Sequence, residues 1–287
     1  MQQRPTIAPS RPTSLRAYLP RFSRRDILEG AIIAVAFLSY FWVRGAVVDQ
    51  PDAAYRHARH VIDAERALHF FWEGDMNRWV THYHWLAQVL NYCYFYLHFP
   101  LIIVFGIWAY YYRRDKYTFI RDSFLASGTI ALVIYWAYPV APPRDLAALA
   151  SQYDPGAPAY IHGFFDTMKE YLGYAYDSES TQAFVNPYAA MPSLHFGWDL
   201  LLGLGIINCF RGQRFGWLAI AVGVALPVTQ IFAITMTANH FFIDAVAGGI
   251  VAMAGLGIAY TLQRWGYPAI HAQLRRLPWR NPELASG

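Results

Sequence analysis

The sequence predicts an all-α polytopic membrane protein with six transmembrane helices and one interfacial amphipathic helix. Of the 287 residues, 56% are hydrophobic and only 15% are charged, whereas a soluble domain carries about 25% charged residues. Six apolar stretches also approach the roughly 20 residues that a spanning helix needs. The net charge of +4 fits a membrane protein with basic cytoplasmic loops, so we expect no nucleic-acid partner. Cys93 and Cys209 lie in apolar runs, which argues against a disulfide framework or a cysteine metal site.

The spans are predicted from the apolar runs in chain order: Ile27–Val43, Trp85–Tyr110, Ser123–Val140, Phe196–Phe210, Trp217–Thr235 and Phe241–Leu262. The first is too long for the apolar part of a cleaved signal and does not end in small residues. The second is interrupted by polar residues and Pro100, so we expect a kink or tilt. The fourth is short, and we expect it to begin at Pro192, with Pro192-Ser193 in its first turn. Small residues in the last span predict close helix packing: Gly248, Gly249, Gly255 and Gly257.

The Lys and Arg residues predict the orientation. They gather in the N-terminal tail, after the second and fourth spans, and in the C-terminal tail. By the positive-inside rule these segments are cytoplasmic. We therefore expect a multi-pass plasma-membrane protein with both termini cytoplasmic. Its predicted parts are an Arg/Pro-rich tail (1–26), a six-span catalytic domain (27–263) and a second cytoplasmic tail (264–287).

Two connections on the outer side have distinctive sequences: one is amphipathic, and the other is the longest in the chain. Asp52–Trp72 reads as an amphipathic helix, with Val61, Ala64, Leu68 and Phe71 marking its apolar face. We favour an interfacial helix on the outer leaflet over a substrate gate. The longest connection runs over residues 141–191, and a loop of this length in a compact protein tends to be functional.

Two short strings place a carboxylate four residues after a histidine: His195 with Asp199, and His240 with Asp244. Residues at this spacing share a helical face. Ionisable groups at membrane depth cost about 2.5–3.5 kcal/mol each, so their presence needs a reason. Both histidines lie near the outer, N-terminal end of a span, where free backbone N–H groups favour an anion. Arg144 follows the outer end of the third span, so three motifs reach one membrane face.

These residue types suit phosphoryl transfer through a phosphohistidine. A carboxylate can hold the tautomer of a nucleophilic histidine, a second histidine can protonate the leaving oxygen, and an arginine can bind phosphoryl oxygens. Structural alternatives stay open: buried His–Asp pairs, Ser193 as a helix cap and Asp199 as an interior carboxylate. A cavity-lining role for His98 also stays open. We expect no metal site and no cofactor.

The motifs resemble a known family. Ala190-Met191-Pro192-Ser193-Leu194-His195 and Asn239-His240-Phe241-Phe242-Ile243-Asp244, with Pro142-Pro143-Arg144 upstream, are similar to those of the type 2 phosphatidic acid phosphatase superfamily. They look most like the branch that contains fungal inositol phosphorylceramide synthase. The resemblance implies that His240 attacks phosphorus with Asp244 as its orienting partner. It also implies that His195 is the general acid and that Arg144 and Ser193 bind phosphate.

Four positions depart from the phosphatase pattern. Ala137 stands where that pattern has a Lys, and Leu194 replaces the Gly before the middle histidine. Ala233 and Ile234 replace a Ser-Arg pair before the last histidine. Two of the pattern's three cationic phosphate ligands are therefore missing, which favours a transferase over a simple phosphatase.

The sequence thus predicts a metal-independent enzyme that acts on a lipid phosphate or a phospholipid headgroup. We favour transfer to an alcohol, with a polyol as a possible acceptor, in the manner of an inositolphosphotransferase. A phosphatidate or polyprenyl-phosphate phosphatase that uses water is the enzymatic alternative. A non-catalytic lipid transporter or binder is the alternative from another class. The sequence leaves the lipid, the acceptor and the oligomeric state open.

Overall fold

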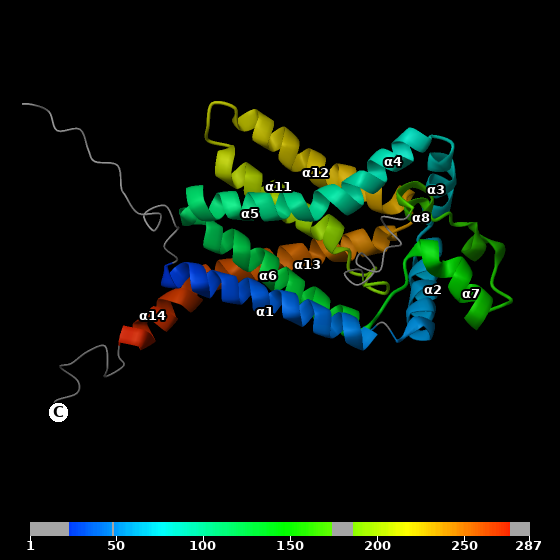
Figure 1. Ribbon diagram of the computed structural model, residues 1–287, viewed down its shortest axis with the longest axis horizontal. Coiled ribbons are helices and arrows are strands. Elements are labelled where there is room, and N and C mark those ends of the chain that lie inside the picture. Colours follow the sequence, from blue (N-terminus) through cyan, green and yellow to red (C-terminus); the bar gives the residue numbers. More distant parts are fainter. Residues whose placement is uncertain (1–22, 48, 174–185, 276–287) are drawn as a thin grey trace, which may run out of the picture. The chain divides into compact units, whose positions relative to one another are not determined.

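The computed structural model describes residues 23–47, 49–173 and 186–275, so most of the first predicted tail and the last half of the second lie outside the described residues. The described part is helical, and its one extended pairing is an isolated bridge between Val140 and Ala189. The predicted all-α membrane architecture is confirmed (Figure 1). Among the described residues, five helices are long and apolar enough to span a membrane. The remaining predicted span, the fourth along the chain, is a shorter apolar helix, Leu194–Phe210.

The bounds of the elements follow the chain. The spans are α1 (Arg24–Val47), α4 (His84–Tyr92) with η2 (Cys93–Leu97) and α5 (His98–Tyr112), α6 (Arg114–Ala137), α11 (Leu194–Phe210), α12 (Gly216–Met236), and α13 (Phe242–Thr261) with η5 (Leu262–Gly266) and α14 (Tyr267–Arg275). The connections contain α2 (Pro51–Ala67), α3 (Glu73–Thr81), η3 (Pro143–Asp145), α7 (Leu146–Tyr153), η4 (Ala159–Gly163) and α8 (Thr167–Leu172).

The chain divides into two units within α1, at Ser39. In the first unit, α1 begins with a reciprocal cap: the Ser23 N–H donates to Asp26 at 2.6 Å, and the Ser23 hydroxyl oxygen accepts the Asp26 N–H at 3.2 Å. The second unit, which begins at Tyr40, contains all three motifs.

Three predicted boundaries move. The fourth span begins at Leu194 and not at Pro192, because the Ser193 side chain accepts the Phe196 N–H and caps the helix from outside. The last span does not end near residue 263, since η5 and α14 continue it to Arg275. The third begins at Arg114 rather than Ser123. The predicted interruption of the second span is confirmed as a π-helical turn over Cys93–Leu97, one of the recognised causes of helix distortion.

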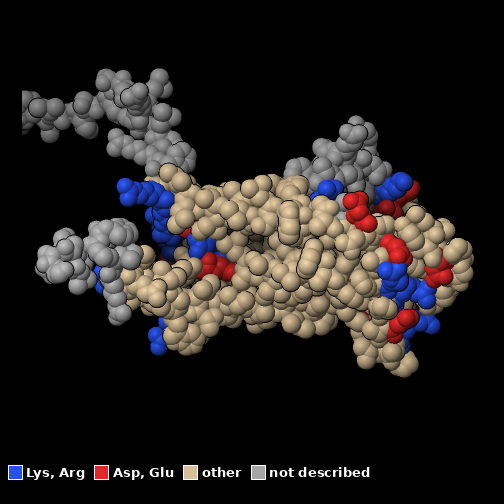
Figure 2. All heavy atoms as spheres, turned by 90° about the horizontal axis from the view of Figure 1, so that it is seen from below, with Lys and Arg blue, Asp and Glu red and all other residues tan. Residues whose placement is uncertain are grey.

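The helices of the second unit turn large apolar side chains outward and small residues inward. Val224, Val228 and Phe232 of α12 are exposed, and charged side chains gather toward the two ends of the face seen in Figure 2, leaving a broad stretch without them. This arrangement suits contact with lipid, in which helices associate through close packing of small residues.

Helix α11 touches α13 and α12 at glycines. A Cβ at Gly197 would lie 2.5 Å from the Gly248 carbonyl oxygen, and one at Gly248 would overlap the Ser193 carbonyl oxygen. Gly203 and Gly223 meet in the same way between α11 and α12. The predicted role of the glycines in the last span is thus confirmed at Gly248, whereas Gly257 has nothing within 4 Å of an added Cβ.

Helices α2 and α7 cover the end of the second unit that carries the motifs, which we call the motif end (Figure 1). The predicted amphipathic helix is present but ends at Ala67, before the predicted Trp72. Its buried face contains Tyr55, Val61 and Ile62 and packs into a cluster with Leu146 and Phe241, while Ala64 and Leu68 are exposed. The predicted apolar face was therefore partly wrong, because contacts with other helices, and not contact with lipid, determine which side of α2 is buried.

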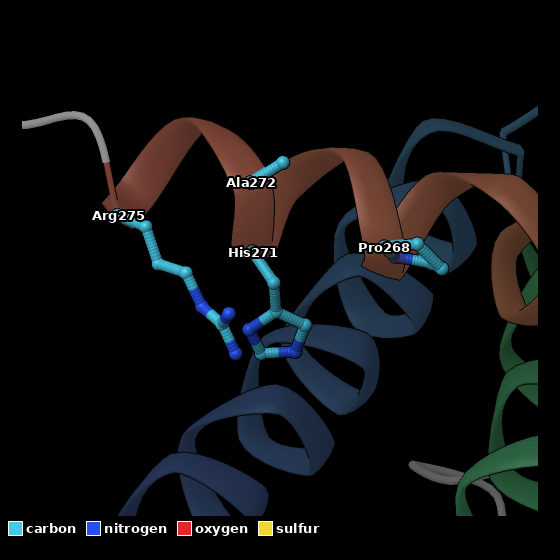
Figure 3. A pocket seen from close by; sticks show the side chains of 4 residues that line it. All are labelled: Pro268, His271, Ala272 and Arg275. Atoms are coloured by element: carbon cyan, nitrogen blue, oxygen red, sulfur yellow. The ribbon is translucent and has the colours of Figure 1, made fainter.

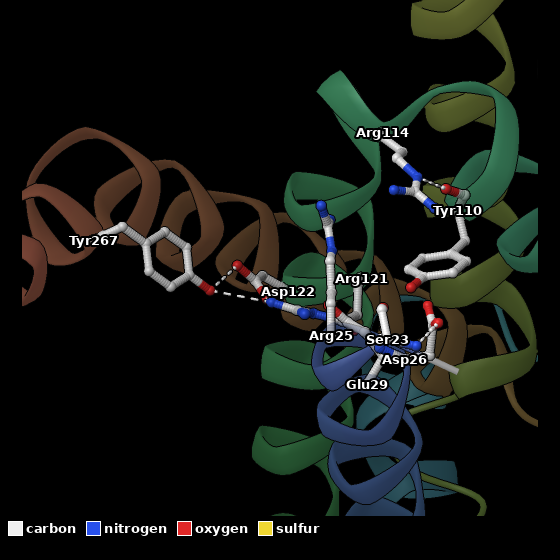
Figure 4. A network of polar contacts seen from close by, with 9 residues as sticks. All are labelled: Ser23, Arg25, Asp26, Glu29, Tyr110, Arg114, Arg121, Asp122 and Tyr267. Atoms are coloured by element: carbon white, nitrogen blue, oxygen red, sulfur yellow. Dashed lines mark hydrogen bonds and ion pairs between the residues drawn. The ribbon is translucent and has the colours of Figure 1, made fainter. Parts of the chain in front are cut away.

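The opposite end has its own polar contacts. The Tyr267 hydroxyl donates to Asp122 at 2.6 Å, and Arg121 donates to the other Asp122 oxygen at 2.6 Å (Figure 4). The bond from Tyr267 connects α14 to α6. A pocket on α14 is lined by Pro268, His271, Ala272 and Arg275 (Figure 3). It lies at the opposite end from the histidine motifs, so it is no part of their site.

The contact between α11 and α13 makes a stability prediction. Gly248→Ala forces the two helices apart, and overpacking of this kind costs about 1–3 kcal/mol. We expect a clearly lower melting temperature for the purified protein in detergent. Gly257→Ala, in the same helix with open space around it, is the matched control and should melt like the wild type. Equal melting temperatures for both variants would contradict the close contact.

Candidate active site

Backbone hydrogen bonds hold the three motif segments together. The Arg144 N–H donates to the Ala238 carbonyl at 2.9 Å, which joins the first motif to the last. The Ala190 N–H donates to the Val140 carbonyl at 3.1 Å, which joins the middle motif to the segment before Arg144. The Ser193 N–H donates to the Asp244 carbonyl at 2.8 Å, across the α11–α13 contact. The predicted convergence of the motifs is therefore present.

His240 lies in the turn before α13 and is 3% exposed. Its Nδ1 is 2.7 Å from the Ala190 carbonyl oxygen. Because a carbonyl only accepts, this nitrogen carries the proton, and the lone pair is on Nε2. Nε2 is buried and has no hydrogen-bond partner among the described residues. The geometry thus leaves Nε2 available as a nucleophile.

Asp244 is fully buried beside His240, with its Oδ2 3.6 Å from the histidine Nδ1. The hydrogen bond of that Nδ1 goes to Ala190, while Asp244 Oδ2 accepts the Phe241 N–H at 2.8 Å. Asp244 therefore places a negative charge near the ring and caps α13, and the Ala190 carbonyl fixes the tautomer. Sequence reasoning missed this carbonyl, since no side chain signals it.

His195 sits in the first turn of α11 and faces His240, with the ring centroids 5.6 Å apart. It lies between two aromatic rings, stacked on Tyr94 at 4.0 Å and 4.6 Å from His98. No hydrogen bond or ion pair to a carboxylate is formed by His195 within the described ranges. The two motif histidines are close enough to reach one phosphate ester.

The two predicted phosphate ligands also reach the site. The Arg144 guanidinium donates to the Asn239 side-chain oxygen, and its Nε is 3.7 Å from Asp145. Its side chain is only 6% exposed, so the cation is held against the residue that precedes His240. Ser193 is fully buried, and its oxygen caps α11. Its hydroxyl proton can still donate to an anion.

The turn that carries Asn239 and His240 has an unusual backbone. Ala238 has φ of 57°, in the left-handed region that non-glycine residues rarely adopt. This conformation lets the N–H groups of Asn239 and His240 both donate to the Ile234 carbonyl, at 2.9 and 3.0 Å. It also points the Ala238 carbonyl at Arg144. The turn between α12 and α13 therefore fixes the backbone position of His240.

One expectation about anion binding is wrong for α13. Its terminal N–H groups are not free for a phosphate, because three carboxyl groups accept them. Phe241 donates to Asp244 at 2.8 Å, Phe242 to Glu73 at 2.7 Å and Ile243 to Glu65 at 2.9 Å. The positive end of this helix is occupied by protein groups, and only the amides at the start of α11 remain as candidates.

Sequence reasoning did not identify Glu65 and Glu73 as residues that contact the start of α13. Both are fully buried. Burial and the neighbouring Glu73 carboxylate raise the pKa of Glu65 to about 10, so Glu65 keeps its proton beside Glu73. Burial also raises the pKa of Glu73, opposed by the N–H of Phe242. The available signal was the position of Glu65 on the buried face of α2, four residues after Val61.

His98 and Asp199, whose roles the sequence left open, are brought together beside His195. The histidines of the first connection do not join them: His57 faces the Pro139 carbonyl and His60 the Tyr138 hydroxyl. Among the described residues, no group of three or more His, Cys, Asp or Glu side chains is placed to hold a metal ion.

Comparison with known proteins gives one family. The model of the PAP2 superfamily matches residues 59–258, well over half of the chain and all three motifs. The searches of curated proteins and of solved structures gave no match.

The carboxyl pair predicts a pH-dependent stability. Glu65 has a pKa of about 10 in the folded protein and 4.5 as its ordinary value, so folding takes up a proton between these values. The contribution of Glu65 to the free energy of unfolding is then most favourable at low pH and falls as pH rises toward 10, by at most about 1.4 kcal/mol per pH unit. Glu65→Gln keeps an acceptor for Ile243 and a donor for Glu73 without this cost. We expect the variant to melt above the wild type at pH 9 and close to it at pH 5.5.

The exposed Glu170 of α8 supplies the control. Glu170→Gln should follow the wild-type melting temperature at every pH. If Glu65→Gln does the same, or melts lower at pH 9, the protonated carboxyl pair is refuted.

Proposed function

Since the chain belongs to the PAP2 superfamily, whose members are phosphatases and phosphotransferases acting on phosphate esters, we propose that it transfers a phosphoryl group or a phospho-headgroup from a lipid through a phosphohistidine. His240 is the nucleophile, His195 the general acid and base, and Arg144 with Ser193 the phosphate ligands. The observation that carries the proposal is the unpartnered Nε2 of His240, opposite His195 and beside Arg144.

The reaction has two halves. In the first, the lone pair of His240 Nε2 forms a bond to phosphorus while the bond from phosphorus to the leaving oxygen breaks, and His195 gives its proton to that oxygen. In the second, the acceptor hydroxyl gives its proton to His195, its oxygen bonds to phosphorus, and the P–N bond breaks. Both histidines return to their starting states, and no proton is gained or lost overall.

The surroundings of His240 support its role. The Ala190 carbonyl holds the Nδ1 proton, so the ring presents Nε2 throughout. The nearby Asp244 carboxylate stabilises the positive charge that the ring acquires when Nε2 binds phosphorus. Arg144 supplies the positive charge for the phosphoryl oxygens.

The absence of two cationic residues of the phosphatase pattern supports an alcohol, rather than water, as the acceptor. Ala233 and Ile234, at positions where the phosphatase pattern has polar and cationic residues, are fully buried apolar side chains. A site with fewer cations suits a phosphodiester, which carries one negative charge, better than a phosphomonoester dianion. We therefore favour a phospholipid donor and an alcohol acceptor, in the manner of inositolphosphotransferases.

We place the site on the extracytoplasmic side of the plasma membrane. The excess of Arg and Lys in the segments that precede the first span and follow the second and fourth supports this placement. The motif end then faces outward, and the donor and the product remain in the outer leaflet.

The test is a product assay in detergent with a chelator present. Phosphatidylinositol is offered as donor with a ceramide or another long-chain alcohol as acceptor, and phosphatidic acid is offered separately with water alone. We expect an inositol-phosphorylated alcohol from the first mixture, and at least about a hundredfold loss with His240→Ala, since removal of the nucleophile removes the covalent route.

His82→Ala is the control, because His82 is exposed and lies outside the site. It should retain wild-type turnover. Free phosphate from phosphatidic acid as the sole product would replace the transferase by a phosphatase. Full activity in His240→Ala, or activity that requires an added metal ion, would overturn the phosphohistidine mechanism. Lipid binding without turnover in the wild type would favour the non-catalytic alternative.

A further inference from the structure

A second histidine–carboxylate pair lies next to His195. His98 Nδ1 is 2.8 Å from Asp199 Oδ1, and the two side chains are 0% and 5% exposed. The residues come from different helices: His98 begins α5, directly after the π-helical turn, and Asp199 lies in α11. Because the carboxylate oxygen accepts this hydrogen bond, His98 carries the proton on Nδ1, and the Asp199 carboxylate lies against the ring.

The pair contacts the general acid of the proposed reaction. Asp199 follows His195 by four residues and so shares its helical face. The ring of His98 lies 4.6 Å from that of His195, tilted by 34°. Two more aromatic rings lie near His98: Trp198 is parallel to it at 6.4 Å, and Phe99 is edge-on at 4.8 Å. The charge of Asp199 therefore reaches His195 through one buried imidazole.

A purely structural role leaves one atom unexplained. His98 Nε2 is buried and has no hydrogen-bond partner among the described residues. An unpaired polar atom and a charged carboxylate are both costly at membrane depth. An apolar pair of similar volume would pack this position without either cost, so a chemical use of the charge accounts better for the arrangement.

His195 needs such a charge. The charged and titratable groups that act on it from the elements around it are His98, His240 and Arg144, all of them basic. Tyr94 lies against its ring, and Cys93 lies within the field of Asp199. A general acid must hold a proton before the leaving group departs, and basic neighbours oppose that. Asp199 is the acidic group that bonds to His98, the imidazole whose ring lies 4.6 Å from that of His195.

We propose that Asp199, acting through His98, keeps His195 protonated so that it can give its proton to the leaving oxygen. His98 and Asp199 are positioning residues: neither touches the phosphorus, and His98 retains its Nδ1 proton throughout. His195 gives one proton to the leaving oxygen and regains one from the acceptor, so the proton count of the proposed reaction is unchanged. The inference rests on the proposed function.

The test compares two phosphate esters that differ in their need for an acid. Phosphatidylinositol loses its diacylglycerol as a strongly basic alkoxide unless that oxygen is protonated, whereas the diester 4-nitrophenyl inositol phosphate loses a stable phenolate. We expect Asp199→Asn to lower kcat for phosphatidylinositol by about tenfold or more, with KM within about twofold, and to leave kcat for the 4-nitrophenyl ester within about threefold. The alkaline limb of the kcat–pH profile for phosphatidylinositol should move to lower pH.

Two further variants make the outcome specific. His98→Gln should show the same selective loss, which keeps the test valid if one of the two variants folds poorly. Asp122→Asn removes a buried carboxylate at the opposite end, 6% exposed, and should leave both esters at wild-type rates. Equal loss for both esters with Asp199→Asn and His98→Gln, or no loss, would overturn the inference while leaving the proposed function intact. If the wild type turns over neither ester, the proposed function fails, and the inference fails with it.

Discussion

The close approach of α11 and α13 is the constraint on which the site depends. Two glycines allow the backbones to touch, and the Ser193 N–H then reaches the Asp244 carbonyl at 2.8 Å. This contact brings the start of one histidine helix against the start of the other. The Ala190 carbonyl consequently meets His240 Nδ1, which decides the tautomer. A packing feature of small residues thus determines which nitrogen of His240 bonds to the protein and which, in the proposed function, faces the substrate.

The same approach explains the distribution of charge around the site. The terminal N–H groups of α13 point into the protein, where Asp244, Glu73 and Glu65 accept them. A phosphate therefore cannot use them, and in the proposed function Arg144 is the central cation of the site. Helices α2 and α3 anchor the start of α13 through these two glutamates. The connection after the first span is in this way part of the site's architecture rather than a separate surface element.

Much of this could be predicted from the sequence, because it depends on local patterns. Apolar length predicts the spans, and the four-residue spacing of His240 and Asp244 predicts a shared face. The rest depends on contacts between distant segments. The bond from His98 to Asp199 joins residues 101 positions apart, and the Ala190 carbonyl has no side-chain signature. The buried face of α2 was misjudged because the apolar pattern was matched to lipid, whereas the helix packs on α7 and Phe241.

The central claim is that His240 presents Nε2 to phosphorus. The most direct test traps the phosphoenzyme with a ³²P-labelled donor in the absence of acceptor, quenches it at alkaline pH and determines which ring nitrogen carries the phosphoryl group. The Nδ1 contact with Ala190 predicts phosphorus on Nε2 of His240, in a bond that is stable to alkali and labile to acid. Phosphorus on Nδ1 of that ring, or on another residue, would contradict the geometry on which the mechanism rests.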